Sequence, residues 1–173
     1  MVQPWQVSTH LPNSHCQYCG TAYAEDAWPR ICTGCGETTW RNPLPVSLLL
    51  VPVIPAGGGR PGVVVVRRDI EPARGELCLP GGFLEYGETW QEGAARELRE
   101  EAALHADPAE ITLFDVLSTG RHILVVGVVP ARHAADLPPS VATDESTEWL
   151  VLERAETLAF PAHTEAVAAF FSR

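Results

Sequence analysis

The sequence predicts an α/β sandwich with a small cysteine-rich segment in front of it. Short apolar runs, rich in valine and leucine and of strand length, stand on both sides of one central amphipathic helix. A second helical stretch closes the chain, and two pairs of cysteines precede the first apolar run. This order packs helices against a sheet, but by itself it leaves several topologies open.

The size and charge of the chain limit what it can be. Its 173 residues have room for one ordinary domain and a small appendage. A formal net charge of −10 disfavours broad binding to nucleic acid, so phosphates would have to be bound through metal ions or a few local arginines. No apolar run approaches the roughly 18 residues of a membrane span, and residues 1–5 lack the features of a secretory signal. We therefore expect a soluble, cytoplasmic protein with no membrane partner.

The cysteines are grouped as metal ligands usually are. Cys16 and Cys19 form one C-x2-C pair and Cys32 and Cys35 form another, which in a cytosolic chain predicts a tetrahedral Zn²⁺ site of four thiolates. A disulfide pairing would instead need an oxidising compartment. Because about 20 residues cannot bury a core, zinc must supply the folding energy of this segment. We expect an N-terminal arm and zinc ribbon over residues 1–42, followed by a second domain over residues 43–173.

Strand and helix signals alternate through the second domain. Strands are expected, in order, over residues 46–54, 63–68, 77–79, 111–118, 122–129 and 147–152. Thr89 and Glu92 form a capping box, so the central helix should begin at Trp90. It should end near Ala106, before an Asp-Pro pair. Pro161 should start the last helix.

The central helix carries a stripe of carboxylates. Glu97, Glu100 and Glu101 have the i, i+3, i+4 spacing that places side chains side by side on a helix. Three like charges there repel one another, and only a cation in front of them turns that cost into a gain. Oxygen ligands from one rigid helix suit a hard ion such as Mg²⁺ or Mn²⁺. The alternative is a solvated acidic helix in which Arg96 pairs with Glu92 and Glu100 at i,i+4 spacing.

The wider spacing of these residues resembles the Nudix box. Gly82 is followed after five residues by Glu88, and after seven more by the run Arg96-Glu97-Leu98-x-Glu100-Glu101. One fixed position departs from the Nudix pattern, where Ala103 stands in place of glycine. The resemblance implies a Nudix-type α/β/α sandwich with a mixed sheet between helices, in which the box forms a loop and the central helix.

The same resemblance implies an enzyme that hydrolyses a nucleoside diphosphate linked to another moiety. The implied ligands of Mg²⁺ or Mn²⁺ are the Gly81 carbonyl and the carboxylates of Glu97, Glu100 and Glu101. Arg96 is implied to hold these carboxylates in place for catalysis. The general base stays open between Glu97, Glu101 and Glu145, a residue of a late loop whose charge could equally be plain solvated surface.

Two arginines before the box, Arg68 and Arg74, are the expected phosphate contacts, although both could equally be surface charges. A four-cysteine ribbon directly before the box is similar to the NADH pyrophosphatases. The Ser-Gln-Pro-Trp motif of that group is missing, because residues 114–120 read FDVLSTG. ADP-ribose or another nucleotide sugar is therefore as plausible a substrate as NADH, and nucleoside triphosphates are a third option.

Two alternatives come from other functional classes. A non-catalytic Nudix-fold nucleotide sensor typically lacks box glutamates, all of which this chain keeps. A zinc-ribbon nucleic-acid binder needs a basic patch, which the ribbon does not have. The expected partner is therefore a small-molecule nucleotide, and a second copy of the chain could complete the pocket in a homodimer.

Overall fold

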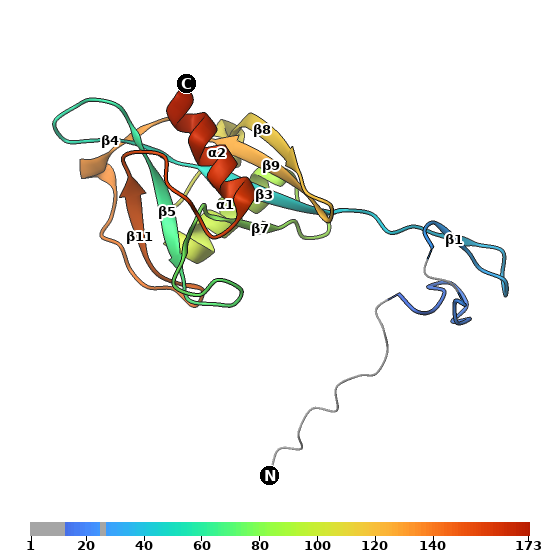
Figure 1. Ribbon diagram of the computed structural model, residues 1–173. Coiled ribbons are helices and arrows are strands. Elements are labelled where there is room, and N and C mark those ends of the chain that lie inside the picture. Colours follow the sequence, from blue (N-terminus) through green and yellow to red (C-terminus); the bar gives the residue numbers. More distant parts are fainter. Residues whose placement is uncertain (1–12, 25–26) are drawn as a thin grey trace, which may run out of the picture. The chain divides into compact units, whose positions relative to one another are not determined.

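The computed structural model describes residues 13–24 and 27–173 and divides the chain into two compact units, at Asn42 and Pro43 (Figure 1). Part of the expected N-terminal arm lies outside the described residues. No helix in the described ranges is long and apolar enough to cross a membrane.

The first unit is built on two similar turns. Strands β1 (Arg30–Ile31) and β2 (Thr38–Thr39) pair antiparallel. In each turn a glycine with positive φ, Gly20 at 76° and Gly36 at 79°, donates its N–H to the carbonyl of the first cysteine of its pair. Glycine adopts this conformation at no steric cost, so the residue after each C-x2-C pair meets a backbone requirement.

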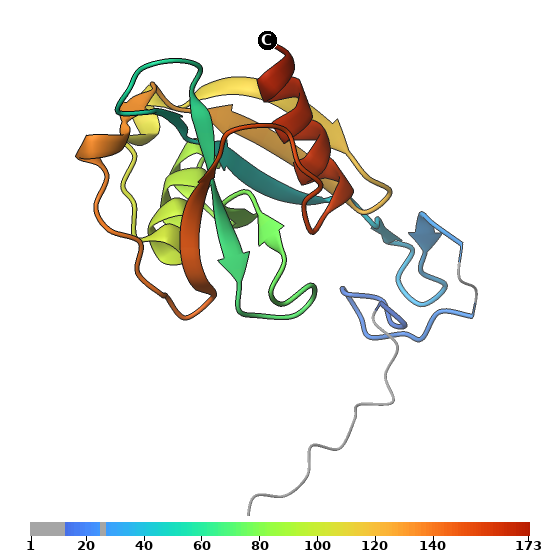
Figure 2. The same cartoon turned by 60° about the vertical axis from the view of Figure 1, so that its left-hand side comes forward.

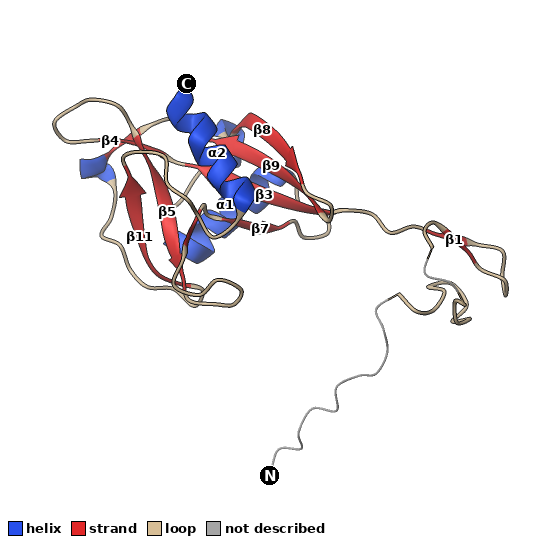
Figure 3. Cartoon of the chain, in the orientation of Figure 1, coloured by secondary structure: helices blue, strands red, loops and turns tan. Residues whose placement is uncertain are grey.

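The second unit holds two sheets, drawn in red in Figure 3. One sheet has the order β7-β3-β9-β8 and contains β3 (Leu44–Leu50), β7 (Gly81–Phe83), β8 (Thr112–Ser118) and β9 (His122–Val128). The other has the order β10-β4-β5-β11, with β6 also paired to β5; it contains β4 (Pro52–Ile54), β5 (Gly62–Arg68), β6 (Leu77–Cys78), β10 (Arg132–His133) and β11 (Ser146–Leu152). Each sheet has one parallel pair, β3 with β9 and β4 with β10, and the other pairs are antiparallel. The expected mixed pairing is confirmed.

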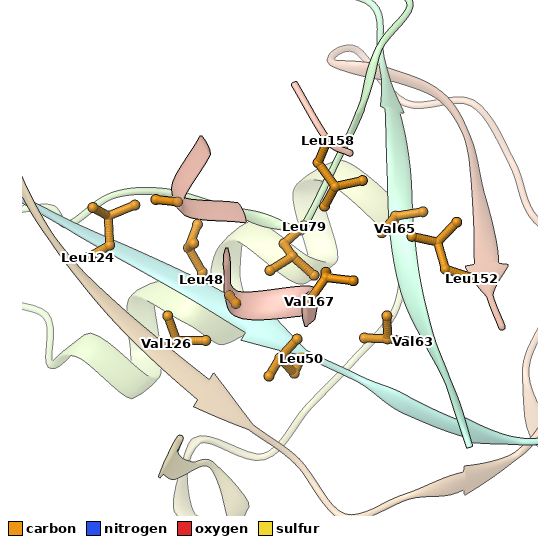
Figure 4. Packing of buried hydrophobic residues seen from close by; sticks show 12 residues of the cluster. Leu48, Leu50, Val63, Val65, Leu79, Leu124, Val126, Leu152, Leu158 and Val167 are labelled. Carbon is orange, nitrogen blue, oxygen red and sulfur yellow. The ribbon is translucent and has the colours of Figure 1, made fainter. Parts of the chain in front are cut away.

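Two helices complete the unit, α1 (Trp90–Ala102) and α2 (Pro161–Ser172), with short 3₁₀ turns at Pro108–Glu110 and Ala134–Asp136. Alternation along β3 and β5 sends successive side chains to opposite faces. Leu48 and Leu50 lie in a cluster with Val167 of α2, shown in Figure 4, whereas Leu49 lies in a second cluster with Leu98 of α1. Figure 2 shows the helices on opposite sides of the strands. The predicted α/β/α sandwich is confirmed.

Two expected boundaries are wrong. The single strand over residues 46–54 is two strands, β3 and β4, which belong to different sheets. The chain changes sheets at Val51, because Pro52 has no N–H with which to continue the ladder. The central helix ends at Ala102, not near Ala106. Ala103 adopts a left-handed conformation (φ 54°, ψ 25°), and this turn lets Leu104 bury its side chain in the cluster beneath α1.

Candidate active site

Arg96 organises the acidic face of α1. Its guanidinium donates to both oxygens of Glu88 at 3.2 and 2.9 Å, to Glu97 at 2.8 Å and to Glu100 at 3.0 Å. It also donates to the Phe83 carbonyl at 3.0 Å, which ties the helix to β7. The Arg96 hydrogen bonds and the backbone N–H of Glu85 hold the pKa of the Glu88 carboxyl below its usual range, against the effect of burial.

Glu92 does not take part in this network. Its carboxylate accepts from the N–H of Thr89 at 2.7 Å and closes the predicted capping box. The simple acidic helix with a Glu92–Arg96 pair is therefore not what the structure contains.

Glu101 and Glu97 are buried, with 4% and 9% of their surface exposed. Burial raises the pKa of Glu101 to about 8, although the Gly81 N–H donates to its Oε2 at 2.9 Å and opposes the shift. Burial also raises the pKa of Glu97, and the nearby Glu100 and Glu145 charges add to the shift against the opposing effect of Arg96. A buried carboxylate is costly when charged unless a cation or hydrogen bonds compensate it. These two side chains therefore fit a bound cation.

Two glycines of the box allow close approaches, one to a carboxylate and one to a strand. A Cβ on Gly82 would lie 2.4 Å from Oε1 of Glu97, and a Cβ on Gly81 would lie 2.2 Å from the carbonyl oxygen of Ser47. Any larger residue at either position would displace the glutamate or the strand. The loop of the box thus packs closely against the central helix at Gly82 and against β3 at Gly81.

The acidic residues face a cavity of about 830 Å³, a volume typical of small-molecule sites. Both sheets and both helices line it, and its walls include Val46, Arg68, Phe83, Glu97, Glu100, Glu101, His122, Glu145, Phe160 and His163. Glu145 precedes β11, and its charge acts on both Glu97 and Glu101. The structure thus brings the three helix glutamates and the late-loop glutamate to one cavity.

The two arginines expected to contact phosphate have different positions. Arg68 lines the cavity, donates to the Pro72 carbonyl at 2.8 Å, and lies 5.1 Å from the centre of the Phe160 ring. Arg74 is exposed, pairs with Asp69 at 2.7 Å, and is not among the residues that line the cavity. Only Arg68 is placed to meet a ligand there.

Sequence reasoning missed the contribution of α2. Phe160, Pro161, Ala162 and His163 all line the cavity. The proline marks the start of a helix, but no local signal shows that this helix begins beside the Nudix-like box. Its position depends on hydrogen bonds to β6, such as Ala159 N–H to the Leu77 carbonyl at 2.8 Å.

The four cysteines of the first unit form a compact group. Their sulfur atoms all lie within 4.8 Å of one another, with Cys16 and Cys35 at 3.7 Å and Cys19 and Cys32 at 3.5 Å. All four are free thiols. A tetrahedral Zn²⁺ with Zn–S bonds of about 2.3 Å places its sulfurs roughly 3.8 Å apart, so the group fits one zinc ion.

Comparison with known proteins decides the family. The chain matches the NUDIX domain over residues 44–170. The chain belongs to the Nudix family. A crystal structure of a NUDIX hydrolase from Nitrosomonas europaea is 26% identical, with a TM-score of 0.71, and the match covers 92% of this chain and 90% of that one.

Two curated Nudix relatives match shorter stretches. Nudix hydrolase 3 from Caenorhabditis elegans is 40% identical over 65 residues, which is 36% of this chain and 27% of that protein. An ADP-ribose pyrophosphatase from Methanocaldococcus jannaschii is 43% identical over 42 residues, which is 24% of this chain and 25% of that protein. The matches therefore span about a quarter of the length of each curated relative.

Proposed function

We propose that this Nudix protein is a metal-dependent pyrophosphohydrolase that splits the diphosphate of a nucleoside diphosphate linked to another moiety, with ADP-ribose as the favoured substrate. The observation that carries the proposal is the pair of buried glutamates, Glu97 and Glu101, on the wall of a ligand-sized cavity. The similarity to a named ADP-ribose pyrophosphatase supports the choice of substrate. NADH and nucleoside triphosphates are the alternative substrates.

The proposed metal site uses the residues of the box. The Gly81 carbonyl and the carboxylates of Glu97, Glu100 and Glu101 would hold Mg²⁺ or Mn²⁺, which when bound makes a water more acidic and offsets the charge of the diphosphate. Arg96 holds Glu97 and Glu100 at the cavity wall, and the Gly81 N–H holds Glu101. Arg68, on another wall, would contact a phosphate oxygen.

Glu145 is the favoured general base. Glu97 accepts from Arg96 and Glu101 accepts from Gly81, whereas within the described ranges the Glu145 carboxylate has no hydrogen bond or ion pair. A base must be free to accept the proton of the attacking water. In the proposed reaction that water forms a bond to phosphorus, its proton passes to the base, and the bond to the bridging oxygen breaks. ADP-ribose and water would thereby give AMP and ribose 5-phosphate.

The first unit is proposed to bind one structural zinc ion. Four thiolates would fill its coordination shell and leave no position for a reacting water. Zinc would then stabilise this unit without taking part in hydrolysis.

The decisive experiment is a substrate panel with Mg²⁺ or Mn²⁺, in which AMP release from ADP-ribose and NADH and pyrophosphate release from nucleoside triphosphates are measured. We expect AMP release from ADP-ribose and a loss of at least about a hundredfold in Glu101→Gln, as is typical when a group that stabilises the transition state is removed. Glu110→Gln, an exposed glutamate outside the cavity, is the control and should keep wild-type activity. If the wild type and Glu101→Gln are equally inert while both bind ADP-ribose, the protein is a nucleotide sensor.

A further inference from the structure

His163 lies in the first turn of α2 and is buried, with 6% of its surface exposed. Its Nδ1 accepts a hydrogen bond from the backbone N–H of Leu79 at 3.1 Å. Leu79 stands between β6 and β7, two residues before Gly81. The histidine therefore holds the segment that carries the Gly81 N–H, which in turn holds Glu101.

The contact with Leu79 fixes the chemical form of the ring. A backbone N–H can only donate, so Nδ1 must be the unprotonated acceptor, and the single ring proton must lie on Nε2. A second proton on Nδ1 would meet the Leu79 N–H and break this bond. Burial lowers the pKa of His163 to about 4, and the nearby charge of Arg68 acts in the same direction. The ring is thus a neutral donor at neutral pH.

The Nε2–H has no hydrogen-bond partner in the part of the chain that the structure describes. The bond from Leu79 uses Nδ1, and no group of residues 13–24 or 27–173 hydrogen-bonds Nε2. His163 lines the cavity together with Arg68 and with Pro161 and Ala162, the first residues of α2. The donor is therefore available to a ligand in the cavity, and it lies beside the Arg68 cation and the positive end of a helix dipole. All three features favour an anion.

We propose that His163 donates a hydrogen bond from its neutral Nε2–H to a phosphate oxygen of the bound nucleotide, next to Arg68. The inference rests on the proposed function, because it assigns a further substrate contact at the same cavity. The phosphates would then have contacts that need no metal ion, from Arg68 at the end of β5 and His163 at the start of α2. The tautomer set by Leu79 prepares the donor before the ligand arrives.

Two substitutions separate the donor from the structural contact. In His163→Asn the side-chain oxygen can occupy the place of Nδ1 and accept from Leu79, but the donor at Nε2 is lost. In His163→Gln the amide reaches the place of Nε2 and can donate, but the Leu79 N–H loses its acceptor. We expect His163→Asn to keep its Tm and to lose roughly ten- to a hundredfold in kcat/KM, the effect of removing a hydrogen bond to a charged group. His163→Gln should lose several degrees in Tm, because the Leu79 N–H loses its acceptor.

His105→Asn is the matched control, because His105 is exposed and lies outside the cavity. It should match the wild type in Tm and in kcat/KM. If His163→Asn keeps wild-type kcat/KM, the donor role is wrong and the histidine only supports the fold.

Nuclear magnetic resonance on the ¹⁵N-labelled wild type tests the contact without relying on turnover or on a variant that folds. Long-range ¹H–¹⁵N spectra at pH 7 should show the Nε2–H tautomer for His163. Titration with ADP, without added Mg²⁺ or Mn²⁺, should then shift the Nε2 resonance together with backbone resonances of cavity residues such as Phe83 and Thr119. Shifts at those residues but none at Nε2 would overturn this inference alone. If ADP shifts no resonance of the cavity, the proposed nucleotide site fails and this inference fails with it.

Discussion

Replacement of Arg96 by glutamine tests the central network of the box. The guanidinium joins three carboxylates to the Phe83 carbonyl, and its side chain is only 18% exposed. Glu88 and Glu97 are also mostly buried, with side chains 15% and 12% exposed. Removing one partner of a largely buried pair leaves an uncompensated charge and costs about 3–5 kcal/mol. For a protein of this size we expect Tm to fall by roughly 6–20 °C.

Thermal unfolding followed by circular dichroism measures this loss, and Arg99→Gln is the matched control. Arg99 lies on the same helix but is 53% exposed, and its contact with Glu100 is 3.4 Å long. An exposed pair of this kind contributes at most about 1 kcal/mol, so the control should stay within a few degrees of the wild type. Equal Tm values for the two variants would refute the view that Arg96 compensates buried charge.

Three further predictions address the glutamates, the end of the helix and the zinc site. Because the pKa of Glu101 is raised to about 8, the unfolded chain binds fewer protons than the metal-free folded state between about pH 4.5 and 8. The free energy of unfolding should therefore fall by a few kcal/mol as pH rises through this window. Urea titrations should show a flatter fall for Glu101→Gln, and an equally steep fall in the variant would contradict this prediction. Ala103→Gly should raise the free energy of unfolding by roughly 0.5–1 kcal/mol, because glycine adopts the left-handed conformation without strain. Ala102→Gly, one position earlier in the helix, should lower the free energy of unfolding. Changes of the same sign for both variants in chemical denaturation would refute the proposed role of position 103. Cys32→Ser should lose zinc, measured by atomic emission, while the domain over residues 43–173 keeps its activity. The control Cys78→Ala should retain one zinc per chain. If the wild type contains no metal and Cys32→Ser is as stable as the wild type, the cysteines do not bind zinc.

Local patterns were enough to predict the parts of the site that lie close together in the chain. The capping box of Thr89 and Glu92 begins the helix where it was expected. The i, i+3, i+4 spacing brings Glu97, Glu100 and Glu101 to the same cavity. Two C-x2-C pairs, each followed by a glycine, predict a sulfur cluster that the structure contains. In each case the geometry is set by a few neighbouring residues.

Other features required contacts between distant segments. Residues 46–54 read as one apolar strand, yet the chain changes sheets at Val51, so that β3 pairs with β9 and β4 pairs with β5. Residues 103–106 could continue a helix, but burial of Leu104 ends it. Arg68 and Arg74 look alike in sequence, and the pairing of β5 with β6 and the ion pair with Asp69 separate their roles.

By itself, the sequence determined the family, the carboxylate stripe and the cysteine group, because each is a pattern of side chains along a short stretch of chain with known backbone geometry. Only the tertiary structure decided which residues meet this stripe across the cavity. His163 is 66 residues from Glu97 in sequence (163 − 97) and lies in an ordinary alanine-rich helix. It reaches the cavity because Leu79 and α2 pack together, and such packing depends on the whole core rather than on any local signal.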